Sequence, residues 1–269
     1  MKALSRGRLF AWLHSFYVKT YVFVACREGI DLDLLVTNQL GHFLMKKFIL
    51  SSIIATVLPT LGGAQQTEDV VTLKSQGQTV VGTLTRPAGE PAPVVLLLHG
   101  FTGSRDELEI PSTKQGIFVH TANSLAESGF ASLRIDFRGS GESIADITFE
   151  ATTFEGQIAD ALAAIEYLET LETVDGSDIH LIGWSQGGLV ASAVAGRSGM
   201  LDTVALWQAV GDAETTYSGI LGAETMAAGK LAKPDQTVVG KLPWGAEVSL
   251  NGAFFDGIET FDAMSEIAA

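Results

Sequence analysis

The pentapeptide Gly183–Gly187, with the sequence GWSQG, constrains the fold of this chain more than any other segment. The apolar run 179–182 precedes it, and a run of small and apolar residues, 189–196, follows it. Glycines on both sides of a serine allow a sharp, strained turn, because neither flanking position has room for a Cβ atom. The pattern predicts a strand, a tight turn and a helix, with the Ser185 hydroxyl exposed at the apex.

Three further regions predict the sheet around this turn. Residues 93–98 form a continuous apolar run of buried-strand length, and 131–136 read as a second strand. Residues 154–171 carry apolar side chains at helical spacing. Strands and helices that alternate in this way favour an α/β fold, with a mostly parallel sheet and helices on both of its faces.

The segments HGFTG (99–103) and GWSQGG (183–188) resemble those of the α/β-hydrolase superfamily. Within it they look most like the secreted esterase and serine-aminopeptidase-like branch, which includes cinnamoyl and feruloyl esterases. The resemblance implies a lid after the sixth strand, here about 211–252. It also implies that Ser185 is the nucleophile, and that the backbone N–H groups of Phe101 and Gln186 form the oxyanion hole.

The histidines depart from that family's pattern, in which an acid and then a histidine follow the nucleophile. None of the five histidines follows Ser185; they are His14, His42, His99, His120 and His180. His99 is the candidate substitute base, although the resemblance implies that it supports the oxyanion loop. His180 is expected to be structural, and His120 is expected to lie in the helix after the oxyanion loop, at the surface or in contact with the lid. Asp212 is the candidate acid, and the alternative is that it simply turns the chain.

The C-terminal part of the sequence also departs from the family. The resemblance implies two more strand–helix units after the lid, carrying the acid and the histidine. We therefore expect 65–269 to be an incomplete α/β-hydrolase domain, a fragment of an active enzyme that lacks the last strand–helix units. The alternative is a non-catalytic relative that binds a ligand without cleaving it. In a fragment, the strand at 201–207 would form an open edge of the sheet.

The N-terminal region has the layout of a secretory signal. Met45 precedes two lysines, the mainly apolar stretch 48–61 and the small residues 62–64. We expect 45–64 to be a signal peptide and 1–44 to be a mis-annotated upstream extension, with a long leader or a membrane-associated arm as the alternative. The mature protein would be secreted or periplasmic, without stable membrane insertion. Cys26 is the only cysteine, so no disulfide is expected within the chain.

The net charge and the motifs that the sequence lacks reduce the number of possible functions. The net charge of −14, with neutral histidines, repels nucleic acid and anionic lipid. Neither a metal-ligand spacing nor a phosphate-binding loop is present, so no metal or cofactor is expected. The expected activity is hydrolysis of a small-molecule carboxylic ester through an acyl-Ser185 intermediate. A serine exopeptidase or amidase acting on a short peptide is the alternative, because the same groups serve each reaction.

Overall fold

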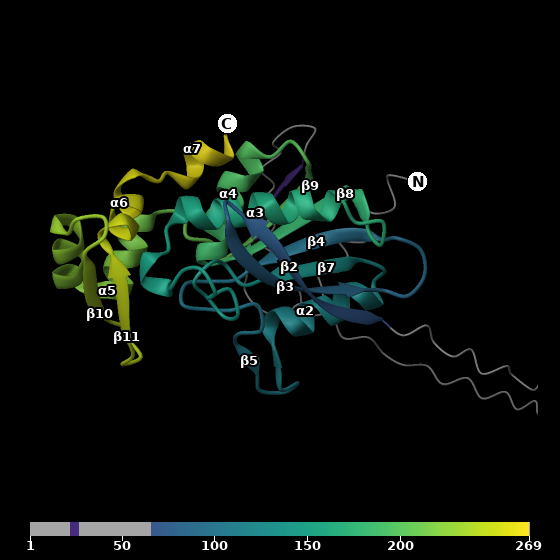
Figure 1. The fold of residues 1–269 in the computed structure, drawn as a ribbon, viewed down its shortest axis with the longest axis horizontal. Coiled ribbons are helices and arrows are strands. Elements are labelled where there is room, and N and C mark those ends of the chain that lie inside the picture. The colour runs from purple at the N-terminus through teal and green to yellow at the C-terminus, as the bar shows by residue number, and fades with distance from the viewer. Residues whose placement is uncertain (1–21, 27–65, 269) are drawn as a thin grey trace, which may run out of the picture.

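The computed structural model describes residues 22–26 and 66–268 of the chain. Its main sheet has seven strands in the order β1-β9-β8-β4-β7-β3-β2 (Figure 1). The outer strands β2 (Thr67–Ser75) and β3 (Gln78–Arg86) form an antiparallel hairpin. The parallel centre comprises β4 (Pro93–Leu98), β7 (Ala131–Ile135), β8 (Asp175–Trp184) and β9 (Leu201–Trp207). The predicted mostly parallel α/β sheet is confirmed.

Helices cover both faces of this sheet (Figure 1). The helices α3 (Phe154–Glu169) and α4 (Gln186–Arg197) pack on one face, and α2 (Ile117–Glu127) packs on the other. Because neighbouring side chains of a strand point to opposite faces, β4 contributes to two cores. Leu96 and Leu98 belong to the core beneath α3 and α4, whereas Leu97 belongs to the core beneath α2. This two-sided burial explains why residues 93–98 are continuously apolar.

The register of the parallel strands brings three loops to one edge of the sheet. Leu98, the last residue of β4, pairs with Ile135 at the end of β7 and with Gly183 near the end of β8. The segments that follow these strands, 99–104, 136–143 and the turn at Ser185, therefore begin at the same level. In open α/β sheets this carboxyl edge is where ligands bind.

The chain after β9 forms a separate group of elements at one end of the sheet (Figure 1). It comprises α5 (Ala213–Leu231), the antiparallel pair β10 (Thr237–Lys241) and β11 (Glu247–Asn251), and α6 (Gly252–Thr260). The 3₁₀ turn η1 (Phe149–Ala151) contacts β11, and α7 (Ala263–Ile267) returns to pack on α4. The range expected to be a lid, 211–252, covers α5, β10 and β11. A short pair of strands, β5 (Glu109–Ile110) and β6 (Gln115–Gly116), lies elsewhere, before α2.

The strand β1 (Val22–Cys26) lies antiparallel to β9 at the end of the sheet. Val22 pairs with Trp207, and Cys26 pairs with Thr203. The expectation that 201–207 forms an open edge is therefore wrong, because the backbone N–H and C=O groups of β9 find partners in an upstream segment. The expected signal peptide, 45–64, and the rest of the expected extension, 1–44, lie outside the described residues. Within 66–268, no helix has the length and apolar character needed to cross a membrane.

Candidate active site

Ser185 occupies a strained turn between β8 and α4. Its backbone angles, φ 54° and ψ −117°, lie in a region that L-residues other than glycine rarely adopt. Hydrogen bonds hold this conformation: its N–H donates to the Trp207 carbonyl at 3.0 Å, and its carbonyl accepts from the N–H groups of Gly188 at 2.9 Å and Val210 at 3.0 Å. The side chain is partly buried and does not cap α4. The turn thus presents a serine hydroxyl that is not used to stabilise the helix.

The two glycines of the pentapeptide are required by close packing. A Cβ atom on Gly187 would lie 2.2 Å from the Leu98 carbonyl oxygen, and one on Gly183 would lie 2.2 Å from the Gly187 carbonyl oxygen. No real Cβ atom approaches a backbone oxygen so closely. The prediction that neither flanking position has room for a Cβ atom is confirmed.

The loop after β4 lies directly against the turn. A Cβ atom on Gly100 would be 3.3 Å from the Cβ atom of Ser185. Phe101 follows Gly100, and Gln186 follows Ser185 as the first residue of α4, where backbone N–H groups have no partner within the helix. In the described part of the chain, neither N–H group donates a hydrogen bond. The structure therefore brings Ser185 together with the two residues expected to form the oxyanion hole.

The Gln186 side chain links the turn to helices on both sides. The hydroxyl of Tyr217 in α5 donates a hydrogen bond to Gln186 Oε1, and Gln186 Nε2 donates to Gln157 Oε1 in α3 at 2.6 Å. Burial raises the pKa of Tyr217 well above its usual value, so its hydroxyl stays protonated and remains a donor. These hydrogen bonds join three buried side chains and hold the start of α4 in place. Sequence reasoning assigned a role only to the Gln186 backbone and missed the network, because its members lie far apart in the sequence.

Aromatic rings cover the loop that carries Phe101. The Phe101 ring contacts Tyr217, Phe254 and Phe149, with centroid distances of 5.4, 5.6 and 5.8 Å. Two of these rings come from α5 and α6, the elements after β9. The C-terminal elements therefore help to position the loop beside Ser185.

A buried ion pair ties the same loop to the segment after β7. Asp136 is completely buried and pairs with the Arg105 guanidinium. It also accepts hydrogen bonds from the backbone N–H groups of Arg105 at 2.7 Å and Glu142 at 2.8 Å. Arg105 forms a second ion pair with the exposed Glu142 carboxylate. The loops after β4 and β7 are therefore held together through one aspartate.

A family model for the alpha/beta hydrolase fold matches residues 93–203, the segment from β4 to the start of β9. The segment from β4 to β9 therefore has the α/β-hydrolase fold. The matched segment contains both the loop that carries Phe101 and the turn that carries Ser185. In this fold, active sites are built from a loop and a turn at these positions.

Two matches to curated proteins are each to an uncharacterized 31.7 kDa protein from the traX-finO intergenic region of Escherichia coli. One is 29% identical over 127 residues and spans 47% of this chain and 41% of the relative. The other is 34% identical over 96 residues and spans 36% of this chain and 30% of the relative. The chain thus covers less than half the length of the curated relatives that it matches.

Solved structures share the fold at low sequence identity. Est1E from Butyrivibrio proteoclasticus is 18% identical, with a TM-score of 0.50 over 74% of this chain and 72% of that one. A putative hydrolase from Agrobacterium vitis S4 is 15% identical, with a TM-score of 0.55 over 75% and 74%. The α/β hydrolase GrgF from Penicillium sp. sh18 is 16% identical, with a TM-score of 0.52 over 76% and 77%. Identities this low show the α/β-hydrolase fold alone.

The described histidines have structural partners. His99 is buried; its Nδ1 lies 2.8 Å from the Gly100 carbonyl oxygen, and its Nε2 accepts the Phe137 N–H at 3.1 Å. Burial lowers the pKa of His99 and keeps the ring neutral. Both ring nitrogens are engaged, so His99 braces the loops after β4 and β7 and has no nitrogen left to take a proton from Ser185. His180, also buried, contacts Thr203 Oγ1 at 2.8 Å, and His120 in α2 lies 3.3 Å from Gln115.

Asp212 caps a helix. It is exposed at the start of α5, and its Oδ1 accepts the Thr215 N–H at 2.8 Å. An aspartate is among the preferred residues for this position, because its carboxylate satisfies a free N–H group. No histidine of the described segments is hydrogen-bonded to it. In residues 66–268, no group of three or more His, Cys, Asp or Glu side chains is placed to hold a metal ion.

Glu107 is a residue of the site that sequence reasoning missed. Its Oε1 accepts the Gly100 N–H at 3.0 Å, and a Cβ atom on Gly103 would lie 1.7 Å from its Oε2. The loop after β4 therefore wraps around this carboxyl group. Burial raises the pKa of Glu107 to about 7, while the N–H groups of Gly100 and Ser104 oppose the rise by stabilising the carboxylate. A lone glutamate after the HGFTG segment gave no sequence signal for this role.

Glu107→Gln is expected to remove part of the pH dependence of stability. The folded chain keeps the Glu107 proton up to about pH 7, whereas the unfolded chain releases it near pH 4.5. Rising pH therefore destabilises the wild-type fold across this window, by about 1–3 kcal/mol from this group. Urea denaturation of both proteins at a series of pH values would measure the difference. Glu109→Gln, at an exposed position, is the control. If the unfolding free energy of the wild type and of Glu107→Gln changed in parallel with pH, the raised pKa of Glu107 would be contradicted.

Proposed function

We propose that this chain is a serine hydrolase that cleaves carboxylic esters through an acyl-Ser185 intermediate. The observation that carries the proposal is the strained Ser185, which lies against Gly100 and beside the free N–H groups of Phe101 and Gln186. A serine held in this way, with two donors next to it, has the two parts that acyl transfer needs: a nucleophile and stabilisation for the oxyanion.

The proposed reaction has two halves. Ser185 Oγ attacks the ester carbonyl carbon, the carbonyl oxygen becomes an oxyanion stabilised by the two N–H groups, and the alcohol leaves. Water then attacks the acyl group and releases the carboxylic acid. The Ser185 proton must pass to a base in the first half, and both His99 nitrogens are already engaged. We therefore expect slow turnover from this chain, about 10³–10⁴ times the uncatalysed rate, as an oxyanion hole supplies without a base.

Mass spectrometry of the chain after treatment with p-nitrophenyl acetate would test the proposal. We expect an acetyl group on Ser185, because the acyl intermediate accumulates when water attack also lacks a base. Ser185→Ala is expected to abolish both this acetylation and the release of p-nitrophenol. Ser198→Ala, at the other end of α4, is the matched control and is expected to react like the wild type. Release of p-nitrophenol at the wild-type rate by a folded Ser185→Ala variant would refute the proposal.

A further inference from the structure

One buried side chain, that of Tyr217 in α5, contacts both residues whose N–H groups are the proposed oxyanion donors. Its hydroxyl donates a hydrogen bond to Gln186 Oε1, and its ring lies edge-on to the Phe101 ring at a centroid distance of 5.4 Å. Tyr217 is 0% exposed and Gln186 is 2% exposed, so water does not compete for this hydrogen bond. The two donor residues come from different segments, the start of α4 and the loop after β4, and Tyr217 joins them.

The hydrogen bond from Tyr217 restrains the peptide group that carries the Gln186 N–H. This group joins Ser185 to Gln186, and its direction depends on the strained ψ angle of Ser185, −117°. Its carbonyl oxygen accepts the Val210 N–H at 3.0 Å. The Gln186 side chain is held at Oε1 by Tyr217 and at Nε2 by Gln157. Loss of the Tyr217 hydroxyl would therefore leave a buried amide oxygen without its donor and release one restraint on this residue.

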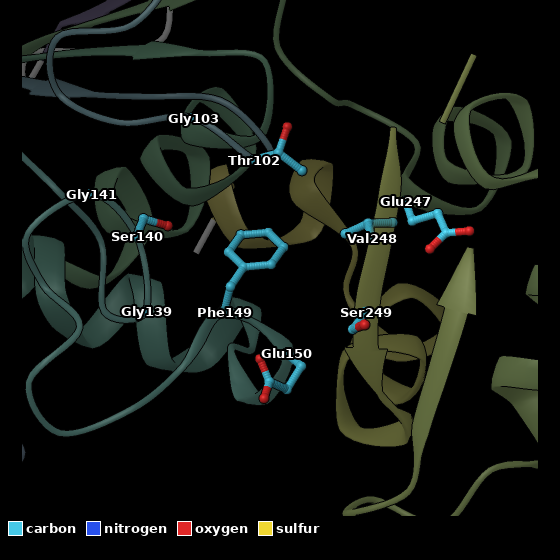
Figure 2. A pocket seen from close by; sticks show the side chains of 10 residues that line it. All are labelled: Thr102, Gly103, Gly139, Ser140, Gly141, Phe149, Glu150, Glu247, Val248 and Ser249. Atoms are coloured by element: carbon cyan, nitrogen blue, oxygen red, sulfur yellow. The ribbon is translucent and has the colours of Figure 1, made fainter. Parts of the chain in front are cut away.

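The ring contact with Phe101 restrains a loop that borders a cleft. Residues 100–103 form a turn closed by a backbone hydrogen bond of 3.2 Å, and Thr102 within it has φ 59°, which is unfavourable for a β-branched residue. Thr102 and Gly103 line a cleft of about 350 Å³, which β11 also lines (Figure 2). The cleft leaves this side of the loop open, so packing of the Phe101 ring against Tyr217 opposes movement of the strained turn.

We propose that Tyr217 positions the oxyanion hole: it holds the N–H groups of Gln186 and Phe101 in the orientation that acylation requires. The inference rests on the proposed function, in which these two groups are the donors. Donors of this kind act only when they point at the oxygen of the transition state, and removal of one slows acyl transfer about 100–1000-fold. Tyr217 lies in α5, so acylation depends on an element that follows the nucleophile and the last parallel strand.

Tyr217→Phe removes the hydroxyl and keeps the ring, so it is expected to release Gln186 and to leave the Phe101 contact in place. With p-nitrophenyl acetate as the probe, we expect the rate constant for acetylation of Ser185 at saturating ester to fall about 10–100-fold, and the half-saturating concentration to change less than about twofold. Loss of folded protein would lower the amount of acetylated chain instead of this rate constant. Tyr167→Phe, the same change at a partly buried tyrosine of α3, is the control and is expected to react like the wild type.

A second variant, Gln186→Leu, tests whether the hydroxyl acts through the Gln186 side chain. Leucine keeps the backbone N–H but cannot accept the hydrogen bond from Tyr217. Gln186→Leu alone is expected to slow acetylation as much as Tyr217→Phe does. In the Gln186→Leu protein, Tyr217→Phe is then expected to slow it less than about twofold further, since the contact is already lost. Equal slowing by Tyr217→Phe in both backgrounds would overturn the proposal.

Amide NMR of the protein without ester separates this inference from the proposed function. Tyr217→Phe is expected to change the chemical shift of the Gln186 N–H, and Tyr167→Phe is expected to leave it unchanged. An unchanged Gln186 resonance in Tyr217→Phe would overturn the inference. Acetylation of Ser185 at the same rate in the wild type and in Tyr217→Phe would support the proposed function and overturn the inference. A shifted Gln186 N–H with acetylation of neither protein would support the positioning contact and overturn the proposed function.

Discussion

Replacing Asp136 with alanine is expected to lower the free energy of unfolding by about 3–5 kcal/mol. Asp136 is completely buried, and its carboxylate satisfies the Arg105 guanidinium together with two backbone N–H groups. Without it, the charge of Arg105 stays largely buried with one exposed partner, and two N–H groups lose their acceptor. Urea denaturation followed by circular dichroism would measure the loss.

Glu142→Ala provides a matched control for Asp136→Ala, because Glu142 pairs with the same guanidinium. The Glu142 side chain is 65% exposed, whereas that of Asp136 is 1% exposed. An exposed partner contributes little, so this variant is expected to lose only about 0–1 kcal/mol. Equal losses of unfolding free energy in the two variants would show that burial does not determine how much each ion pair of Arg105 contributes to stability.

Gly187→Ala is expected to cost about 3 kcal/mol or more of stability, and to slow acetylation of Ser185 about 100-fold. The new Cβ atom would lie 2.2 Å from the Leu98 carbonyl oxygen and 2.5 Å from that of His99. Both are backbone atoms of the strand and loop that flank Ser185, so relief requires the turn to move. Thermal unfolding and the acetylation assay on the same preparation would measure the two effects.

The control for Gly187→Ala is Gly219→Ala, in helix α5. A Cβ atom there would meet no atom within 4 Å, and alanine favours the helix over glycine. This variant is expected to be unchanged or up to about 1 kcal/mol more stable. A Gly187→Ala protein as stable as Gly219→Ala would show that the turn adapts, contrary to the packing described here.

The parts of the fold that could be predicted are those set by local rules. The apolar run 93–98 and the glycines around Ser185 each have a physical cause within a few residues, so strand, turn and helix were predicted correctly. Asp212 shows the limit of such rules. The same Gly-Asp sequence fits a catalytic acid or a chain turn, and the observed cap of α5 depends on the helix that follows.

The parts that could not be predicted depend on distant contacts. Glu107 matters because the loop 100–104 wraps around it, and Tyr217 matters because α5 brings its hydroxyl to Gln186. Neither residue belongs to a motif with fixed spacing. The pairing of β1 with β9 is a further case: an edge strand accepts any segment of suitable conformation, so its partner cannot be inferred from β9 itself.

The pairing of β1 with β9 also has a kinetic consequence. It joins segments separated by most of the chain, so it closes the longest loop in the sheet and is expected to form late in folding. The same pair is then expected to open first in hydrogen exchange. Val22 pairs with Trp207, whose carbonyl oxygen accepts the N–H of Ser185. Opening of the first described strand is therefore expected to affect Ser185 through one residue, Trp207.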